Sequence, residues 1–230
     1  MLRAIDGGAA GPPVLTLALT AMSFGGGPVL GPIDIRLKPA ETLALVGPSG
    51  IGKTTLLRIM AGLEARFSGT LAATERRAFV FQEPTLLPWR SLIDNLRVTT
   101  GVGVDAAEAA LAEVGLAGRG GDFPGQLSLG QRRRLSLARA FAAAPELLLM
   151  DEPFVSLDPD LADEMMALFE RLRASRRVAT VLVTHVEAEA ERLADRIAVL
   201  GGSPARIVEE RQKRGAYFQL SASGVTSSGS

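Results

Sequence analysis

The sequence contains no cysteine and only one histidine among its 230 residues. Disulfides, thiolate chemistry and cysteine-based zinc sites are therefore excluded, and so is a metal site built from several histidines. No charge excess exists either, because 25 Lys and Arg balance 25 Asp and Glu. Without a basic excess, a protein dedicated to binding nucleic acid is not expected.

Long apolar runs are also missing, and the longest, such as residues 178–183, have the length of a strand. A membrane-spanning helix needs roughly 18–20 apolar residues. The N-terminal stretch carries only Arg3 as a basic residue and is a poor match to a secretory signal. With 47% hydrophobic and 22% charged residues, the chain has globular proportions. These features predict a cytoplasmic protein.

Short apolar runs alternate with segments of helical character along most of the chain. We expect helices at 52–61, 105–114 (capped by Asp105), 131–144, 160–174 and 186–194. We expect strands at 14–20, 29–37, 42–46, 70–73, 78–81, 147–150, 178–184 and 197–200. Such alternation with continuous apolar strands predicts a mainly parallel sheet covered by helices.

A chain of this size is expected to form one domain, residues 1–230. The expected helices and strands divide this domain into a core, a helical subdomain and a tail. Residues 14–82 and 147–209 form the core, with an antiparallel β subdomain at the N-terminal side. Residues 83–146 lack strands and form an inserted α-helical subdomain. Residues 210–230 form a tail that is partly disordered, since 221–230 are rich in Ser and Gly. The fold class is therefore α/β.

A complete phosphate-binding motif lies between an expected strand and an expected helix. Residues 47–54 read GPSGIGKT and fit G-x-x-x-x-G-K-[ST]. Its backbone N–H groups turn toward phosphate oxygens, Lys53 adds a positive charge, and the Thr54 hydroxyl can bind Mg²⁺. This motif predicts a nucleotide site made of Gly47, Pro48, Ser49, Gly50, Ile51, Gly52, Lys53, Thr54 and Thr55.

Two carboxylates end the apolar strand at 147–150. Asp151 is suited to hold the Mg²⁺ shell, and Glu152 to orient or deprotonate the attacking water. Together the two motifs predict a P-loop nucleotidase that uses Mg²⁺. By themselves they do not choose among kinases, motors and transporters.

Further motifs resemble those of the ATP-binding cassette (ABC) family. Residues 127–131, LSLGQ, are similar to the family's L-S-G-G-Q signature, and residues 156–158, SLD, to its D-loop. Gln82 resembles the Q-loop residue, His185 the switch histidine, and Phe24 the adenine-stacking aromatic residue. The order and spacing match from about residue 14 to residue 209.

The resemblance implies that ATP is sandwiched between two copies of the chain, with Ser128, Gly130 and Gln131 serving the partner's nucleotide. It implies that Gln82 reaches Mg²⁺ or the lytic water. Asp158 has an inter-subunit role in the family, but here it is equally a helix N-cap before Pro159. Alternatives remain for three residues: Ser128 as a helix cap only, Phe24 as a core residue and His185 as an ordinary residue beside a cap.

Further predictions concern the position of His185, the leucine at position 129 and the three arginines that follow the signature. Thr184 and Glu187 have capping-box spacing, which predicts His185 at the first position of a helix. Leu129 replaces the family's first signature glycine. If that position required a positive φ, leucine would cost about 1–2 kcal/mol, and we expect function to be retained. The adjacent Arg132, Arg133 and Arg134 point around a helix and are interpreted as a solvated face.

Residues 83–90 resemble the loop that receives a membrane-embedded permease. Leu86, Leu87 and Trp89 are suited to a hydrophobic docking surface, although Trp89 could instead be buried in the helical insertion. The run at 87–90, LPWR, is most similar to importers of nitrate, sulfonate and taurine.

The predicted protein is the ATPase subunit of such an importer, bound peripherally at the cytoplasmic face of the inner membrane. Its partners are a second ATPase subunit, permease subunits and, indirectly, a solute-binding protein. The alternatives are an exporter subunit, a soluble cassette protein without a transport role and a small-molecule kinase.

Overall fold

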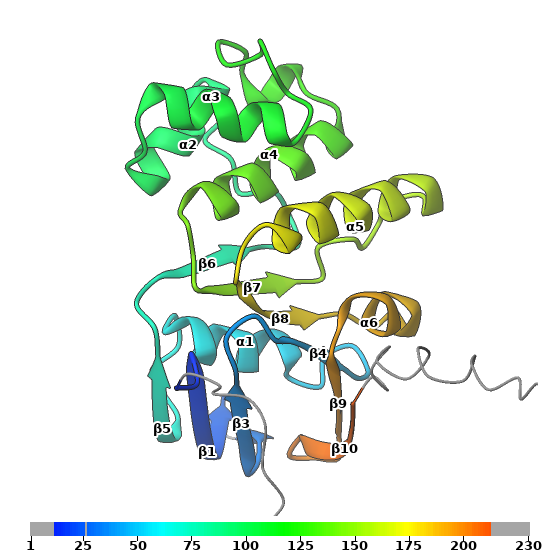
Figure 1. The fold of residues 1–230 in the computed structure, drawn as a ribbon. Helices are drawn as coiled ribbons and strands as arrows, with labels where there is room; N and C mark the ends of the chain where they lie inside the picture. Colours follow the sequence, from blue (N-terminus) through cyan, green and yellow to red (C-terminus); the bar gives the residue numbers. More distant parts are fainter. Residues whose placement is uncertain (1–11, 26, 213–230) are drawn as a thin grey trace, which may run out of the picture.

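The computed structural model describes residues 12–25 and 27–212 (Figure 1). Its first sheet is antiparallel and contains β1 (Leu15–Phe24), β2 (Gly27–Leu30), β3 (Ile33–Leu37) and β5 (Ser68–Ala73). The expected strand at 29–37 is two strands. Gly31 interrupts it by donating its backbone N–H to Ala205 O, and Pro32 has no N–H to give to a ladder.

The second sheet has six strands in the order β10-β9-β4-β8-β7-β6. β4 (Thr42–Val46), β6 (Arg77–Val80), β7 (Leu147–Asp151), β8 (Ala179–Val183) and β9 (Arg196–Gly201) are parallel to one another, and only β10 (Arg206–Gln212) is antiparallel. This confirms the predicted fold class. The sequence did not predict β10, which extends the sheet past residue 209. The expectation of disorder at 221–230 lies outside the described residues.

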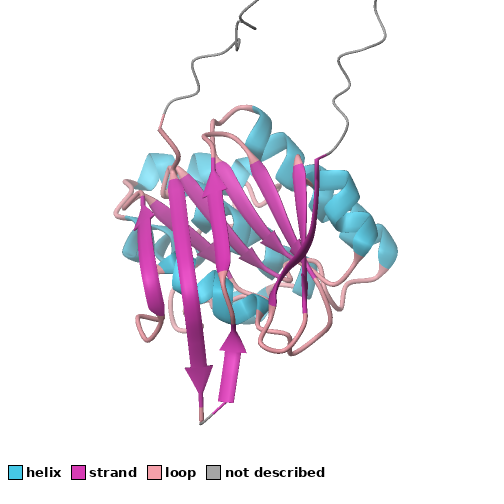
Figure 2. Cartoon of the chain, turned by 90° about the horizontal axis from the view of Figure 1, so that it is seen from below, coloured by secondary structure: helices cyan, strands magenta, loops and turns pink. Residues whose placement is uncertain are grey.

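The central strands are buried on both faces, which explains their continuous apolar sequences. In β7, Leu147 and Leu149 join a core with α1 (Lys53–Ala61) and the antiparallel sheet. Leu148 and Met150 join a second core with α4 (Leu129–Ala142) and α5 (Pro159–Ala174). Helix α1 thus lies between the two sheets, and Figure 2 shows the strands layered against helices.

The helical insertion lies at the end of the molecule opposite the antiparallel sheet (Figure 1). It contains α2 (Leu92–Thr100), α3 (Val104–Glu113), a 3-10 turn (Pro124–Gln126) and α4, and no strand occurs between residues 83 and 146. The sequence analysis missed α2, although Ser91 caps it by accepting from Asp94 N. Asp105 is not the cap of α3, because the helix begins one residue earlier and Gly103 holds the cap position.

Helix α6 (Glu187–Leu193) packs on β4 at a third, smaller cluster of Ala, Val and Ile side chains. Within residues 12–25 and 27–212, no helix combines the length and the apolar character needed to cross a bilayer.

Candidate nucleotide site

The carboxyl ends of β4, β6, β7 and β8 share one edge of the parallel sheet. Parallel strands bring the segments that follow them together at that edge, which is where α/β sheets bind ligands. The phosphate motif follows β4, Gln82 follows β6 and Phe81, Glu152 follows β7, and His185 follows β8 and Thr184. The topology therefore places four separate sequence motifs along the same edge.

Two glycines of the phosphate loop have backbone conformations and close contacts that exclude side chains. Gly47 has φ 153°, and a Cβ there would lie 2.7 Å from Leu200 O. Gly52 caps α1 with φ 112°, and its Cβ would lie 2.7 Å from the Leu30 side chain. The motif's glycines are thus required by the fold before any ligand is considered.

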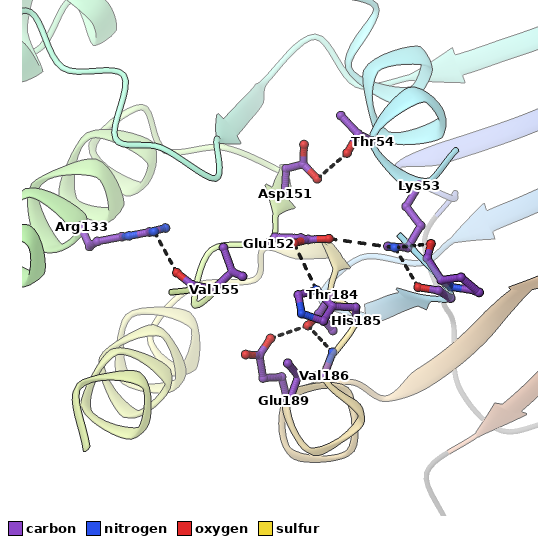
Figure 3. Close-up of polar contacts among 12 residues, drawn as sticks. Lys53, Thr54, Arg133, Asp151, Glu152, Val155, Thr184, His185, Val186 and Glu189 are labelled. Atoms are coloured by element: carbon purple, nitrogen blue, oxygen red, sulfur yellow. Dashed lines mark hydrogen bonds and ion pairs between the residues drawn. The ribbon is translucent and has the colours of Figure 1, made fainter. Parts of the chain in front are cut away.

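Lys53, the first residue of α1, is buried and turned back into the loop (Figure 3). Its Nζ donates to Gly47 O at 2.8 Å and to Pro48 O at 2.9 Å, and lies 4.0 Å from Glu152 Oε1. Burial lowers the pKa of Lys53, while Glu152 and Asp151 oppose this shift. The helix start and the ammonium together favour a bound anion.

Thr54 and Asp151 join α1 to β7. Thr54 Oγ1 donates to Asp151 Oδ1 at 3.1 Å. Asp151 is buried, and this burial raises its pKa, although the hydrogen bond from Thr54 opposes the shift. A hydroxyl and a carboxylate oxygen are hard oxygen donors of the kind that Mg²⁺ takes. These residues therefore fit the predicted metal.

Glu152 and His185 face each other across the ends of β7 and β8 (Figure 3). Glu152 Oε2 lies 3.2 Å from His185 Nδ1, and Glu152 N donates to Val183 O at 2.9 Å. The backbone of Glu152 is left-handed, with φ 44°. This is a costly conformation for a residue with a side chain, and such conformations cluster at functional sites.

The predicted position of His185 at the start of a helix is wrong. Thr184 Oγ1 donates to the buried carboxylate of Glu189 at 2.5 Å and accepts from Val186 N at 3.0 Å. The Thr184 hydroxyl is therefore not part of a capping box with Glu187, and His185 lies two residues before α6. Burial raises the pKa of Glu189, and the bond from Thr184 opposes this shift.

The signature segment forms the start of α4, two residues earlier than expected. Ser128 accepts from Gln131 N at 3.2 Å, and Gln131 Oε1 accepts from Ser128 N at 3.1 Å, which completes a capping box. Gly130 is buried, and a Cβ there would lie 2.9 Å from Leu161 Cδ1. Leu129 is helical and not among the described residues with positive φ, so it carries no such strain.

Within residues 12–25 and 27–212, no hydrogen bond or ion pair joins positions 128–131 to positions 47–54. Ser128 and Leu129 are exposed. Gln82 is exposed as well and lines a cleft with Leu129, Arg132 and Ser156. The structure thus brings together Lys53, Thr54, Asp151, Glu152 and His185, and leaves the signature apart from them.

Comparison with known proteins agrees with this geometry. Residues 30–155 match the family described as "ABC transporter". The chain belongs to the ABC transporter family. It is an ATPase subunit of that family, as the sequence motifs predicted.

Two similar ABC proteins are named for aliphatic sulfonate import. The aliphatic sulfonates import ATP-binding protein SsuB of Granulibacter bethesdensis is 46% identical over 201 residues, covering 86% of this chain and 84% of that protein. The SsuB 2 protein of Streptomyces avermitilis is 48% identical over 193 residues, covering 82% and 77%. Among solved structures, the dimeric ATP-binding cassette MJ0796 bound to ADP and Pi has a TM-score of 0.75 and 25% identity, covering 87% of this chain and 99% of that one.

Two further motif residues of this ABC chain lie at the ends of elements. Phe24 ends β1 with 42% of its surface exposed, so it is not a core residue. The Arg66 guanidinium lies 5.4 Å from its ring centroid, a contact that no sequence signal indicated. Asp158 caps α5 by accepting from Leu161 N at 2.9 Å, with Pro159 as the first helical residue. Its capping role is confirmed.

The loop at 83–90 is held from two sides. The buried Asn95 side chain accepts from Leu87 N at 2.7 Å and donates to Leu87 O at 3.1 Å. From α4, Arg139 donates to Thr85 O at 2.6 Å. Trp89 is nevertheless 70% exposed, so the alternative that it is buried in the insertion is wrong. Sequence reasoning predicted neither the contact of Asn95 with this loop nor that of Arg139.

The interpretation of Arg132, Arg133 and Arg134 as a solvated face is wrong for two of the three. Arg133 is buried and donates to Pro153 O at 2.8 Å and to Val155 O at 3.1 Å. Arg134 donates to Val114 O and pairs with Glu164. The helix spreads the three side chains over different directions, and two of those directions meet protein instead of solvent.

Proposed function

We propose that this chain is the ATPase subunit of an importer for aliphatic sulfonates or related small solutes. The observation that supports the ATPase step most strongly is the convergence of Lys53, Thr54, Asp151, Glu152 and His185 at the carboxyl edge of the sheet. The sulfonate solute rests on the names of the relatives and is the finer part of the proposal.

In this proposal Lys53 and the backbone N–H groups of positions 47–55 hold the phosphates of ATP. Thr54 and Asp151, with Gln82, hold Mg²⁺, which neutralises the phosphate charge when bound. Glu152 accepts the proton of the water that attacks the γ-phosphorus, as the bond to the ADP oxygen breaks. His185 holds the Glu152 carboxylate in position for that transfer, since the two side chains already lie 3.2 Å apart.

We propose that two copies pair head to tail, so that Ser128, Gly130 and Gln131 of one chain bind the nucleotide held by the other. The exposure of Ser128 and the absence of bonds from positions 128–131 to positions 47–54 in the described chain support this arrangement. Asp158 lies in the same partner-facing region of the proposed pair, and Phe24 stacks on the adenine.

Residues 14–209 act as one ATPase domain in this proposal. The exposed Trp89 and the loop that carries it contact the permease subunits, and the solute-binding protein acts only through them. Such contacts place the chain peripherally at the cytoplasmic face of the inner membrane. Binding of nucleic acid forms no part of the proposed function.

Phosphate release from ATP without any acceptor tests the ATPase step, and Glu152→Gln is the decisive variant. We expect ATP-dependent phosphate release by the parent protein, and a loss of about 100-fold or more in the variant with ATP binding retained. Normal turnover by Glu152→Gln would contradict the assignment. Uptake of an alkanesulfonate into vesicles that contain the cognate permease tests the solute separately.

A further inference from the structure

We propose that Arg133 is a positioning residue that holds Glu152 in its reactive orientation by tying helix α4 to the backbone of residues 153–155. This inference rests on the proposed role of Glu152 in ATP hydrolysis. Arg133 lies on the helix that the signature begins, five positions after its cap Ser128, and Glu152 directly precedes the segment that Arg133 binds.

The two hydrogen bonds of Arg133 go to backbone, not to a side chain. Nη1 donates to Pro153 O at 2.8 Å and Nη2 to Val155 O at 3.1 Å, so the planar fork spans both sides of Phe154 (Figure 3 shows the bond to Val155). The guanidinium is fixed because its side chain is buried. A planar fork of this kind fixes the direction of the backbone that it binds.

The bound segment lies between two strained residues. Glu152 has φ 44° and Ser156 has φ 60°, both left-handed and neither a glycine. Such conformations persist only where surrounding contacts determine them. Within the segment itself, Val155 N reaches Glu152 O only at 3.3 Å. Arg133 supplies two shorter contacts to the same turn, at 2.8 and 3.1 Å, and we infer that they set where the Glu152 side chain points.

Stability alone gives a weak reason for an arginine at this place. A buried guanidinium loses its hydration, and Arg133 Nε has no hydrogen-bond partner among the described residues. Apolar neighbours, including Val80, Leu137 and Phe154, line the same small hollow. An apolar side chain of similar length would fill that space without the cost of burying a charge, but it would leave Pro153 O and Val155 O without these donors. The specific contribution of Arg133 is its fork of donors.

Steady-state ATPase kinetics of Arg133→Met and Arg133→Lys test the inference. We expect the Met variant to lose about tenfold or more in kcat with KM for ATP within about twofold, because the phosphate-binding groups are untouched and only Glu152 is misplaced. The Lys variant keeps a single donor atom, Nζ, in place of the planar fork, and should recover part of kcat. Arg173→Met is the control, because Arg173 also donates to two backbone carbonyls, Ala40 O and Leu193 O, besides its ion pair with Asp195.

The control should lower the melting temperature and leave kcat within about twofold, since Arg173 touches no site segment. If the Met variant of Arg133 does not fold, the Lys variant decides. The inference is overturned if the folded Arg133 variants keep parental kcat, or if they raise KM as much as they lower kcat. A parent protein without ATPase activity would instead overturn the proposed function.

A pair made of two different variant chains tests in which chain Arg133 acts. Lys53→Ala inactivates one chain's phosphate loop and Ser128→Arg the other chain's signature, so one intact composite site remains. Arg133→Met should reduce turnover about tenfold when it lies in the chain that supplies Glu152 to that site, and much less when it lies in the chain that supplies Ser128. Equal reductions in both placements would overturn a positioning role within one chain.

Discussion

Two regions of the molecule differ in how completely one chain forms them. The phosphate-loop edge is the edge of the parallel sheet that carries residues 47–54, Asp151 and Glu152, and the signature helix is α4 with its cap Ser128. At the phosphate-loop edge, Lys53 and Asp151 are buried, Glu152 is half-buried and Thr54 is exposed, and all four are bonded to one another or to the loop. At the signature, Ser128 is exposed, and among the described residues its side chain bonds only to its own helix turn. The first region is organised by its own fold, whereas the second presents a helix start to a ligand held elsewhere.

The largest effect is expected at the region that one chain organises. Lys53→Ala removes the buried ammonium and should lower ATP turnover about 100-fold or more, since a single preorganised charge contact contributes that much. Phosphate release measured beside Lys38→Ala checks this, because Lys38 is exposed and precedes the amino end of β4, whereas the phosphate loop follows its carboxyl end. A Lys53→Ala protein with more than a tenth of parental activity would contradict the role given to the loop.

The next experiment tests whether the second region serves another chain. Lys53→Ala and Ser128→Arg should each be nearly inactive alone. When they are mixed, half of the pairs contain both variants and hold one intact site of two, so about a quarter of parental activity should return. Phosphate release from each protein alone and from the mixture measures this. If the mixture released phosphate no faster than the two variants do separately, the phosphate loop and the signature would act within one chain.

A smaller effect is expected on thermal stability, because the phosphate-loop edge contains the buried carboxylate of Asp151. Burial raises the pKa of Asp151 above its usual 3.8. Below that value the carboxyl is protonated in folded and unfolded chains alike, and as pH rises through the raised folded pKa, stability falls because the fold must hold a buried carboxylate. Asp151→Asn keeps an acceptor for Thr54 without the charge.

We therefore expect Asp151→Asn to melt a few degrees higher than the parent at pH 7, without nucleotide, and at the same temperature near pH 3. Thermal unfolding at both pH values is the measurement, with Asp34→Asn on the exposed face of β3 as the control. If Asp151→Asn raised the melting temperature as much at pH 3 as at pH 7, the gain would not come from removing the charge of this carboxylate.

The smallest effect is expected from Leu129→Gly, which restores the family's signature residue. Leu129 has helical backbone, so glycine relieves no strain and costs roughly 0.5–1 kcal/mol of helix stability. ATP turnover should stay within about twofold of the parent. A large gain in turnover would mean that the leucine side chain obstructs the partner's nucleotide.

The predictable part of the site consists of groups whose chemistry is local. The phosphate loop, Asp151 and Glu152 were identified because each lies where a continuous apolar strand ends, and strand ends of a parallel sheet share an edge. His185 was identified as a site residue but placed wrongly, because the spacing of Thr184 and Glu187 indicated a cap and the buried Glu189 competes for the same hydroxyl. Sequence spacing does not show which of two acceptors a hydroxyl meets.

The sequence alone determined the α/β class, the order of the motifs and the residues of the phosphate-loop edge, because these follow from periodicity and from chemistry between near neighbours. Only the tertiary structure decided which arginines are buried, that Arg133 binds Pro153 and Val155, and that Trp89 remains exposed. The physical reason is that a helix sends adjacent side chains in different directions. What each direction meets depends on segments distant in sequence, such as the turn after β7 that lies against α4.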